Sequence, residues 1–240
     1  MLYIIGLGLN EKGISNGGIE AIRKCKKIYL ENYTVEFPYS VKTLEKVIRK
    51  KIISLDRVEV ESERLVKEAK KNNIALLVYG CPLFATTHMS LILDAKKSNV
   101  KTQVIYSASV FDAIAGTGLQ LYKFGKITSM PKWENHFNPD SFLEFVEGNK
   151  KINAHSLILI DIGLSCKDAL NELEISCKKR GFDLDNLIIC SSLGTSKAEI
   201  FYGDINKLRK KCKKVSHLFC FIIPSKMHFL EKEAVERFEV

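Results

Sequence analysis

Short apolar runs alternate with amphipathic stretches along the first part of the chain. The runs at residues 2–7, 28–30, 74–79 and 102–106 have the length and composition of β-strands. Apolar positions recur at helical spacing after Asn16, after Ser40, around Leu65 and over residues 88–97, and Asn16 is the expected cap of the first of these helices. This alternation of strand and helix predicts a mostly parallel sheet with helices on both sides.

The second half of the chain has a different pattern. Apolar runs at 156–161 and 187–192 flank a helical stretch at 167–179, and residues 218–223 form the last strong strand pattern. Further elements are expected at residues 109–115, 126–130, 141–146 and 200–203, with a loop over 131–139. The sequence therefore predicts an α/β protein of two domains, 1–108 and 109–240. The first domain is expected to hold the mostly parallel sheet, and the second a sheet of mixed strand directions.

The composition is that of a folded protein. Hydrophobic residues make up 46% of the 240 residues, which is enough for a buried core and excludes intrinsic disorder. The N-terminus lacks the basic segment of a signal peptide, and no apolar stretch reaches the roughly 18 residues needed to cross a bilayer. We therefore expect a cytoplasmic protein without a membrane partner.

The net charge of +9 raises the question of a nucleic-acid partner. The basic residues, however, fall in short groups at 49–51, 178–180 and 209–211, where predicted helices end and cations suit both the helix dipole and solvent. We expect no direct contact with nucleic acid, although attraction to another acidic macromolecule stays open. The seven cysteines form no CxxC pair and lie mostly in apolar runs, which indicates reduced core residues with no disulfide framework and no metal site.

A glycine-rich turn follows the first predicted strand. Gly6 and Gly8 would let the backbone approach a ligand closely, so a side chain at Gly8 is expected to block binding without unfolding the chain. Glu31 stands near the position of a ribose-binding acid, as in dinucleotide-binding proteins. The third glycine of that motif is missing, since position 11 is Glu and the next glycine is Gly13. A nicotinamide cofactor is therefore weakly supported.

The loop at residues 80–88 (GCPLFATTH) follows the most apolar strand pattern. Loops at the carboxyl ends of strands form the ligand crevice of an open α/β sheet, so this loop is a candidate binding loop. A simpler interpretation also stands, in which Thr87 caps the following helix and His88 is a hydrogen-bonded structural residue.

Several segments together resemble the diphthine synthase family. Residues 3–9 (YIIGLGL) are similar to the opening of these enzymes, and residues 80–88 to their motif Gly-Asp-Pro-x-x-Ala-Thr-Thr-His. Residues 107–110 (SASV) and 118–125 (GLQLYKFG) are the most specific match, and shorter matches at 30–34, 158–162 and 202–204 follow in family order. The resemblance implies the tetrapyrrole-methylase fold, a homodimer, and S-adenosylmethionine in a cleft between two α/β domains.

The same resemblance implies a set of cofactor-binding residues. They are Leu9, Cys81, Phe84, Ser109 and Val110 in the first half, and Ile160, Leu193 and His217 in the second. Backbone groups of the glycine turn and of Ser109 are expected to bond the polar ends of the cofactor, and the apolar members to wall the adenine and the thioether.

Three positions depart from the family pattern. Cys81 replaces the aspartate of Gly-Asp-Pro, which removes an anionic acceptor from the cofactor loop. Ser191 and Ser192 replace an Ala-Arg pair, and Gly163 replaces a basic residue. The last two changes bear on binding of the acceptor.

The activity implied by the resemblance is methylation of the modified histidine of elongation factor 2. Methyl transfer from a sulfonium is an in-line displacement that needs alignment and exclusion of water, so no catalytic residue is expected. The cysteine- and lysine-rich composition suggests a eukaryotic source, which favours four transfers ending in diphthine methyl ester over three ending in diphthine. A tetrapyrrole-type small-molecule methyltransferase and a non-catalytic nucleotide-binding protein stay open as alternatives, although residues 118–125 favour the protein-modifying branch.

Overall fold

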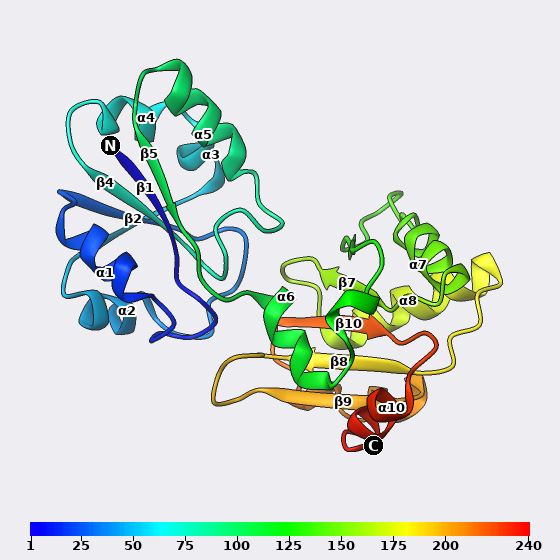
Figure 1. Cartoon of the computed structure of the whole chain (residues 1–240). Helices are drawn as coiled ribbons and strands as arrows, with labels where there is room; N and C mark the ends of the chain where they lie inside the picture. Colours follow the sequence, from blue (N-terminus) through cyan, green and yellow to red (C-terminus); the bar gives the residue numbers. More distant parts are fainter. The chain divides into compact units, whose positions relative to one another are not determined.

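The computed structural model describes residues 1–240, and the chain divides into two compact units, Met1–Asp112 and Ala113–Val240. The division falls a few residues beyond position 108, within the short helix α6 (Val110–Ala113). Each unit has its own sheet and its own core, and each is described by itself (Figure 1).

The sheet of the first unit is entirely parallel. Its strands are β1 (Leu2–Gly6), β2 (Lys27–Glu31), β3 (Ile52–Leu55), β4 (Ile74–Val78) and β5 (Thr102–Ile105), in the order β3-β2-β4-β1-β5. All four pairings are parallel, so the expected mostly parallel sheet is confirmed. Every residue of β1 and of β4 is buried, as expected for central strands covered on both faces.

Helices cover both faces of this sheet (Figure 1). Ile5 of β1 packs on one face with α1 (Asn16–Arg23) and α2 (Val41–Ile48). Ile4 points to the other face, as alternation along a strand requires, and packs against α3 (Arg57–Glu61), α4 (Arg64–Ala69) and α5 (His88–Lys97).

The two central strands send their connections to opposite faces. The chain leaves β1 for α1 on one face, and it leaves the neighbouring β4 for α5 on the other. In open α/β sheets such a switch point opens a crevice at the carboxyl ends of the two strands. The glycine turn at 6–8 and the loop at 80–87 both lie at this edge.

The sheet of the second unit has mixed directions, as expected. Its strands are β6 (Thr128–Met130), β7 (Ser156–Ile160), β8 (Leu187–Ser191), β9 (Glu199–Gly203) and β10 (Phe219–Ile223), in the order β6-β7-β10-β8-β9. The β6–β7 pair is parallel, and the other three pairs are antiparallel. The chain ends at this sheet, because Tyr202 N–H donates to Phe238 O (2.8 Å) and Val240 N–H donates to Tyr202 O (3.1 Å).

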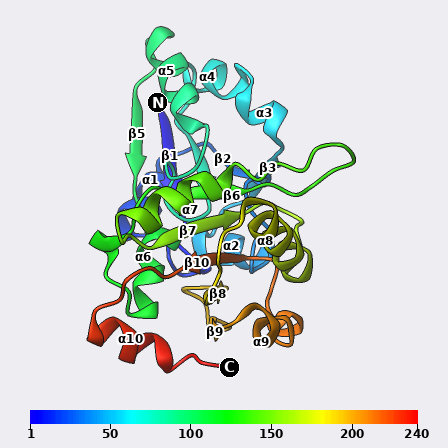
Figure 2. The same ribbon diagram turned by 90° about the vertical axis from the view of Figure 1, so that its right-hand side faces the viewer.

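The second unit contains four further helices, of which the first three contribute side chains to its main core. They are α7 (Phe142–Lys151), α8 (Cys166–Arg180), α9 (Ile205–Arg209) and α10 (Phe229–Glu236), with single 3-10 turns at Ile114–Thr117, Leu121–Lys123 and Cys212–Lys214. The helix α7 packs on β6 and β7, and α9 lies beside α8 and β9 (Figure 2). None of the helices combines the length and the apolar character that crossing a membrane requires.

Candidate functional site

The two glycine turns of the first unit are joined to each other. Gly8 N–H donates to Gly80 O (3.3 Å), and Gly80 N–H donates to Gly8 O (3.0 Å). Both glycines have positive φ, 69° at Gly8 and 70° at Gly80. The loops that follow β1 and β4 therefore form one hydrogen-bonded structure at the switch point.

The glycines of the first turn are required by the turn itself. A Cβ at Gly6 would lie 2.6 Å from Gly80 O. A Cβ at Gly8 would lie 2.9 Å from Gly13 O and 3.0 Å from Ser107 Oγ. A side chain at Gly8 would therefore press on the neighbouring backbone, so loss of ligand binding is expected together with loss of stability, which differs from the expectation of an undisturbed fold.

Three residues of the expected cofactor set lie on the loops at this edge, with different exposures. Leu9 is buried, and its carbonyl accepts a hydrogen bond from the Tyr79 hydroxyl (2.8 Å). Cys81 is buried, whereas the Phe84 ring is 46% exposed and stands edge-on against Phe111, with ring centroids 5.3 Å apart. The loop after β4 thus presents an aromatic surface and covers its thiol.

The main-chain groups of Ser109 are used within its own loop. Its N–H donates to Asp112 Oδ2 (2.7 Å), and its carbonyl accepts from Asp112 N–H (3.1 Å). The hydroxyl donates to the same carboxylate (3.1 Å) and accepts from Phe111 N–H (3.2 Å). Ser109 therefore shapes the turn that carries the half-buried Val110, and its N–H is not free to donate to a cofactor in this conformation, whereas its carbonyl can still accept a second hydrogen bond.

In the second unit the three predicted residues share one edge of the sheet. Ile160 ends β7, Leu193 follows β8, and His217 precedes β10. Since β10 runs antiparallel between β7 and β8, its start lies beside the ends of both. Leu193 is buried, Ile160 is half-buried and His217 is exposed.

The serines that replace the family's Ala-Arg pair form a hydroxyl cluster at this edge. The Ser216 hydroxyl lies 2.6 Å from Ser192 Oγ and 3.2 Å from Ser191 Oγ, and Ser216 N–H donates to Ser191 Oγ (3.0 Å). Ser191 and Ser192 are buried. The cluster is neutral where the family has a guanidinium.

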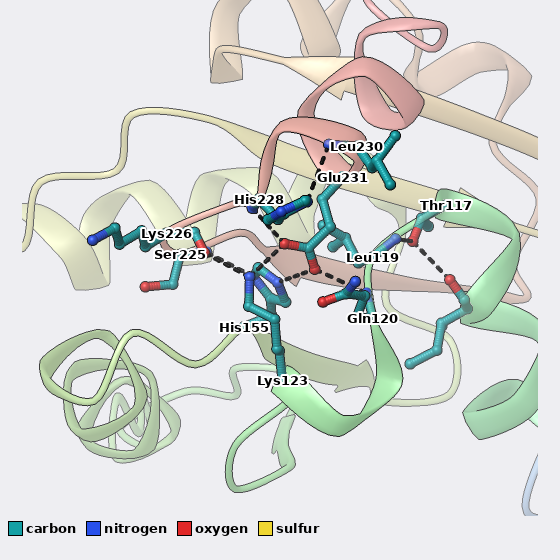
Figure 3. A network of polar contacts seen from close by, with 11 residues as sticks. Thr117, Leu119, Gln120, Lys123, His155, Ser225, Lys226, His228, Leu230 and Glu231 are labelled. Atoms are coloured by element: carbon teal, nitrogen blue, oxygen red, sulfur yellow. Dashed lines mark hydrogen bonds and ion pairs between the residues drawn. The ribbon is translucent and has the colours of Figure 1, made fainter.

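The signature at 118–125 is held from within the second unit by a buried carboxylate (Figure 3). Glu231, in the first turn of α10, accepts hydrogen bonds from the main-chain N–H groups of Gln120 (2.9 Å) and His228 (2.6 Å). It also pairs with the Lys123 ammonium and lies 3.1 Å from His155 Nε2. One side chain therefore fixes the signature against the start of α10.

The tautomer of His155 follows from its two partners. Ser225 N–H donates to Nδ1 (3.0 Å), so Nδ1 is the acceptor and Nε2 carries the proton that faces Glu231. Burial lowers the pKa of His155, which keeps the ring neutral. Burial alone would raise the pKa of Glu231, but the hydrogen bonds from Lys123, the two main-chain amides and His155 outweigh it and lower that pKa to about 2.

The two glycines that bound the signature allow close packing. A Cβ at Gly118 would lie 2.2 Å from the Ala234 Cβ, and a Cβ at Gly125 would lie 2.1 Å from Asn149 Oδ1. Leu121 and Tyr122 are 43% and 82% exposed. Much of the signature is thus explained by the fold of the second unit, and these two side chains are the part turned to solvent.

The sequence did not predict a functional or structural role for Glu231 or His155. They are 76 positions apart, and neither lies in a recognisable motif. The one available signal was Glu231 at the third position after His228, the spacing of a capping box, which the structure contains.

The chain is similar to known proteins along most of its length. The profile of the tetrapyrrole (corrin/porphyrin) methylases matches residues 1–209. A diphthine methyl ester synthase of Dictyostelium discoideum is 37% identical over 100% of this chain and 98% of its own length. A second enzyme of that name, from Candida glabrata, is 44% identical over 68% of this chain and 56% of its own length.

Solved structures agree in fold. A candidate diphthine synthase of Entamoeba histolytica superposes with a TM-score of 0.92 and 31% identity, over 100% of this chain and 98% of that one. Another diphthine synthase gives a TM-score of 0.89 and 29% identity, over 99% and 95% of the two chains. The architecture of both units therefore matches these proteins along almost the whole chain.

Proposed function

Because this chain belongs to the tetrapyrrole methylase family and is a methyltransferase of diphthamide biosynthesis, we propose that it methylates a modified histidine of elongation factor 2 with S-adenosylmethionine. The observation that carries this proposal is the paired glycine turn at the switch point of the first sheet.

The residues present suit an adenosyl-thioether group. Phe84 offers an exposed aromatic surface at the end of β4, and Val110 adds an aliphatic one. Leu9 is proposed to contribute through its main chain, because its side chain is buried, and the loop position of Cys81 is proposed to adjoin the cofactor. Ile160, Leu193 and His217 of the second unit are also proposed to bind the cofactor.

When bound, the cofactor supplies an electrophilic methyl group. The task of the protein is then to hold the acceptor about 3 Å from that methyl group and to exclude water. The acceptor amine must be neutral to attack, and a desolvated surface favours loss of its proton. The proposed mechanism uses positioning by main-chain and apolar groups and needs no side-chain base.

The acceptor is proposed to be the histidine-derived arm of elongation factor 2. Its completed form is a methyl ester, which requires four transfers. The names of the Dictyostelium and Candida relatives support this end product. The net charge of +9 favours an acidic partner. We also propose a homodimer in the cytoplasm, a reducing compartment that suits seven free cysteines.

The deciding experiment is methyl transfer to elongation factor 2 purified from cells that lack this enzyme. The proposal expects label from S-adenosylmethionine on that protein and a mass increase of four methyl groups. A mass increase of only three methyl groups would reject the methyl ester as the product but would still support the methyltransferase activity on this protein. Transfer to a small tetrapyrrole instead, or cofactor binding with no transfer to either substrate, would reject the proposed substrate.

A further inference from the structure

A histidine and a glutamate face each other inside the first unit. His88 is the first residue of α5 and Glu31 is the last residue of β2, and both side chains are fully buried. Because β2 and β4 are adjacent and parallel, Glu31 and the loop after β4 meet at the same edge of the sheet.

One ring nitrogen of His88 holds the binding loop. Nδ1 lies 3.0 Å from Pro82 O, and a carbonyl oxygen can only accept, so Nδ1 carries a proton and donates it. The Thr86 hydroxyl donates to the same carbonyl (2.9 Å). Two donors thus fix the peptide between Pro82 and Leu83.

The other ring nitrogen faces a carboxylate. His88 Nε2 lies 3.5 Å from Glu31 Oε2, an ion-pair distance, and neither atom has a hydrogen bond elsewhere. The second carboxylate oxygen accepts from the Thr34 hydroxyl. Since Nδ1 already carries a proton, a neutral ring would direct a lone pair at the lone pairs of an ionised Glu31. Two buried acceptors opposed in this way would each keep their full desolvation cost.

A single proton removes this conflict. Placed on Nε2 it gives an imidazolium–carboxylate pair, and placed on Oε2 it gives a carboxylic acid that donates to a neutral imidazole. Both arrangements are neutral overall and place a donor opposite an acceptor across the 3.5 Å separation. We propose that His88 and Glu31 share one proton between Nε2 and Oε2, and that this pair positions the loop after β4 for cofactor binding. The positioning role rests on the proposed function, and the shared proton does not.

Two substitutions at Glu31 distinguish the effect of the hydrogen-bond donor from the effect of the length of the side chain. Glu31→Gln can place a permanent N–H against Nε2 and should keep the dissociation constant for S-adenosylmethionine within about twofold of wild type. Glu31→Met has a similar length but no donor, and should weaken binding about tenfold, or about 1.4 kcal/mol. Tyr33→Phe is the matched control, because it removes a neighbouring buried hydroxyl that has no hydrogen-bond partner.

The kinetic pattern distinguishes positioning from general damage. Glu31→Met should raise the KM for S-adenosylmethionine and leave the KM for the acceptor protein unchanged, and Glu31→Gln should restore the first value. Equal KM values for wild type and Glu31→Met would overturn the positioning role. Equal losses in Glu31→Gln and Glu31→Met would overturn it too, because the donor would then not matter.

The shared proton can be observed without any cofactor. In the full chain with ¹⁵N-labelled histidine, wild type should show an exchange-protected proton that is either bonded to Nε2 of His88 or, when it lies on Glu31 Oε2, coupled to Nε2 through the contact. Loss of the signal in His88→Gln assigns it, and Glu31→Met should abolish it. Its absence from folded wild type would overturn the proposal. Wild type that shows the proton but binds no S-adenosylmethionine would overturn the proposed function and the positioning role, while the shared proton would stand.

Discussion

His155 directs its Nε2 proton at Glu231 Oε1 across 3.1 Å, and this contact joins two segments that are 76 residues apart in the chain. Ser225 N–H donates a hydrogen bond to Nδ1 of the same ring. The Glu231 carboxylate also pairs with Lys123 and accepts hydrogen bonds from two main-chain amides. The signature segment therefore owes its conformation to a polar centre whose members come from three separate parts of the sequence.

Glu231→Gln should lower the free energy of unfolding, with an effect that depends on pH. A carboxylate with a pKa lowered from 4.5 to about 2 stabilises the folded state above its unfolded pKa, and this contribution is lost as pH falls from 4.5 through 2. The shift corresponds to about 3 kcal/mol near neutral pH. Urea unfolding of both proteins between pH 7 and pH 3 tests this. A constant difference across that range would contradict the prediction.

Gly125→Ala should destabilise the second unit by about 2–3 kcal/mol, because the new Cβ would lie 2.1 Å from Asn149 Oδ1 and displace a buried amide. That amide also accepts from Lys126 N–H (2.8 Å), so the change disrupts an existing hydrogen bond. Gly148→Ala is the matched control. Gly148 lies within α7 with nothing within 4 Å of a new Cβ, and the change should stabilise by up to about 1 kcal/mol. Thermal unfolding curves that rank the two variants in the opposite order would refute this.

Cys81→Asp restores the residue that the family pattern has at this position. A carboxylate accepts charge-assisted hydrogen bonds, so binding of S-adenosylmethionine should tighten about tenfold, or 1.4 kcal/mol. Cys81 is only 4% exposed, so the carboxylate should also cost some stability in the absence of ligand. Cys81→Asn is the uncharged control and should give no tightening. Calorimetry that finds equal or weaker binding for Cys81→Asp would show that this side chain is not a polar cofactor contact.

Gly8→Ala should weaken cofactor binding and lower stability together. The backbone at Gly8 has φ 69°, and a Cβ there would lie 2.9 Å from Gly13 O. Gly17→Ala is its control, since the nearest atom to a new Cβ is Ser15 Oγ at 3.9 Å. Comparison of melting temperature and dissociation constant for the two variants tests the prediction. Unchanged stability with lost binding in Gly8→Ala would favour a purely ligand-blocking role for the glycine.

Local pattern was sufficient for much of the fold. The helix at His88–Lys97 was predicted with the bounds that the structure has, and Ser40 caps α2 by accepting from Thr43 N–H (3.2 Å). Ser15, rather than Asn16, caps α1, because its hydroxyl reaches Gly18 N–H. In both helices the serine hydroxyl accepts a hydrogen bond from the main-chain N–H three residues later.

The elements that were missed carry weak periodicity. The strand β3 is an edge strand of four residues, and two of them, Ile53 and Ser54, are exposed. The helix α10 begins with the exposed pair Phe229 and Leu230, which places apolar residues on the solvent side. The loops at the switch point were predictable because each follows a strand directly. The hydrogen-bond network around Glu231 was not predictable, because its members come from distant parts of the sequence and meet only in the folded chain.

The mutual hydrogen bonds of Gly8 and Gly80 have a consequence for anyone who would rebuild this protein. The two turns are 72 positions apart but act as a single part, because each supplies the other's main-chain donor and acceptor. A chimaera that takes residues 80–87 from another protein would need to take residues 6–13 from the same protein. Otherwise the two halves of the Gly8–Gly80 hydrogen-bonded pair would come from different proteins, and their bonds would be lost. Transplanted as a pair, the turns should keep their geometry on any parallel sheet in which their two strands are neighbours.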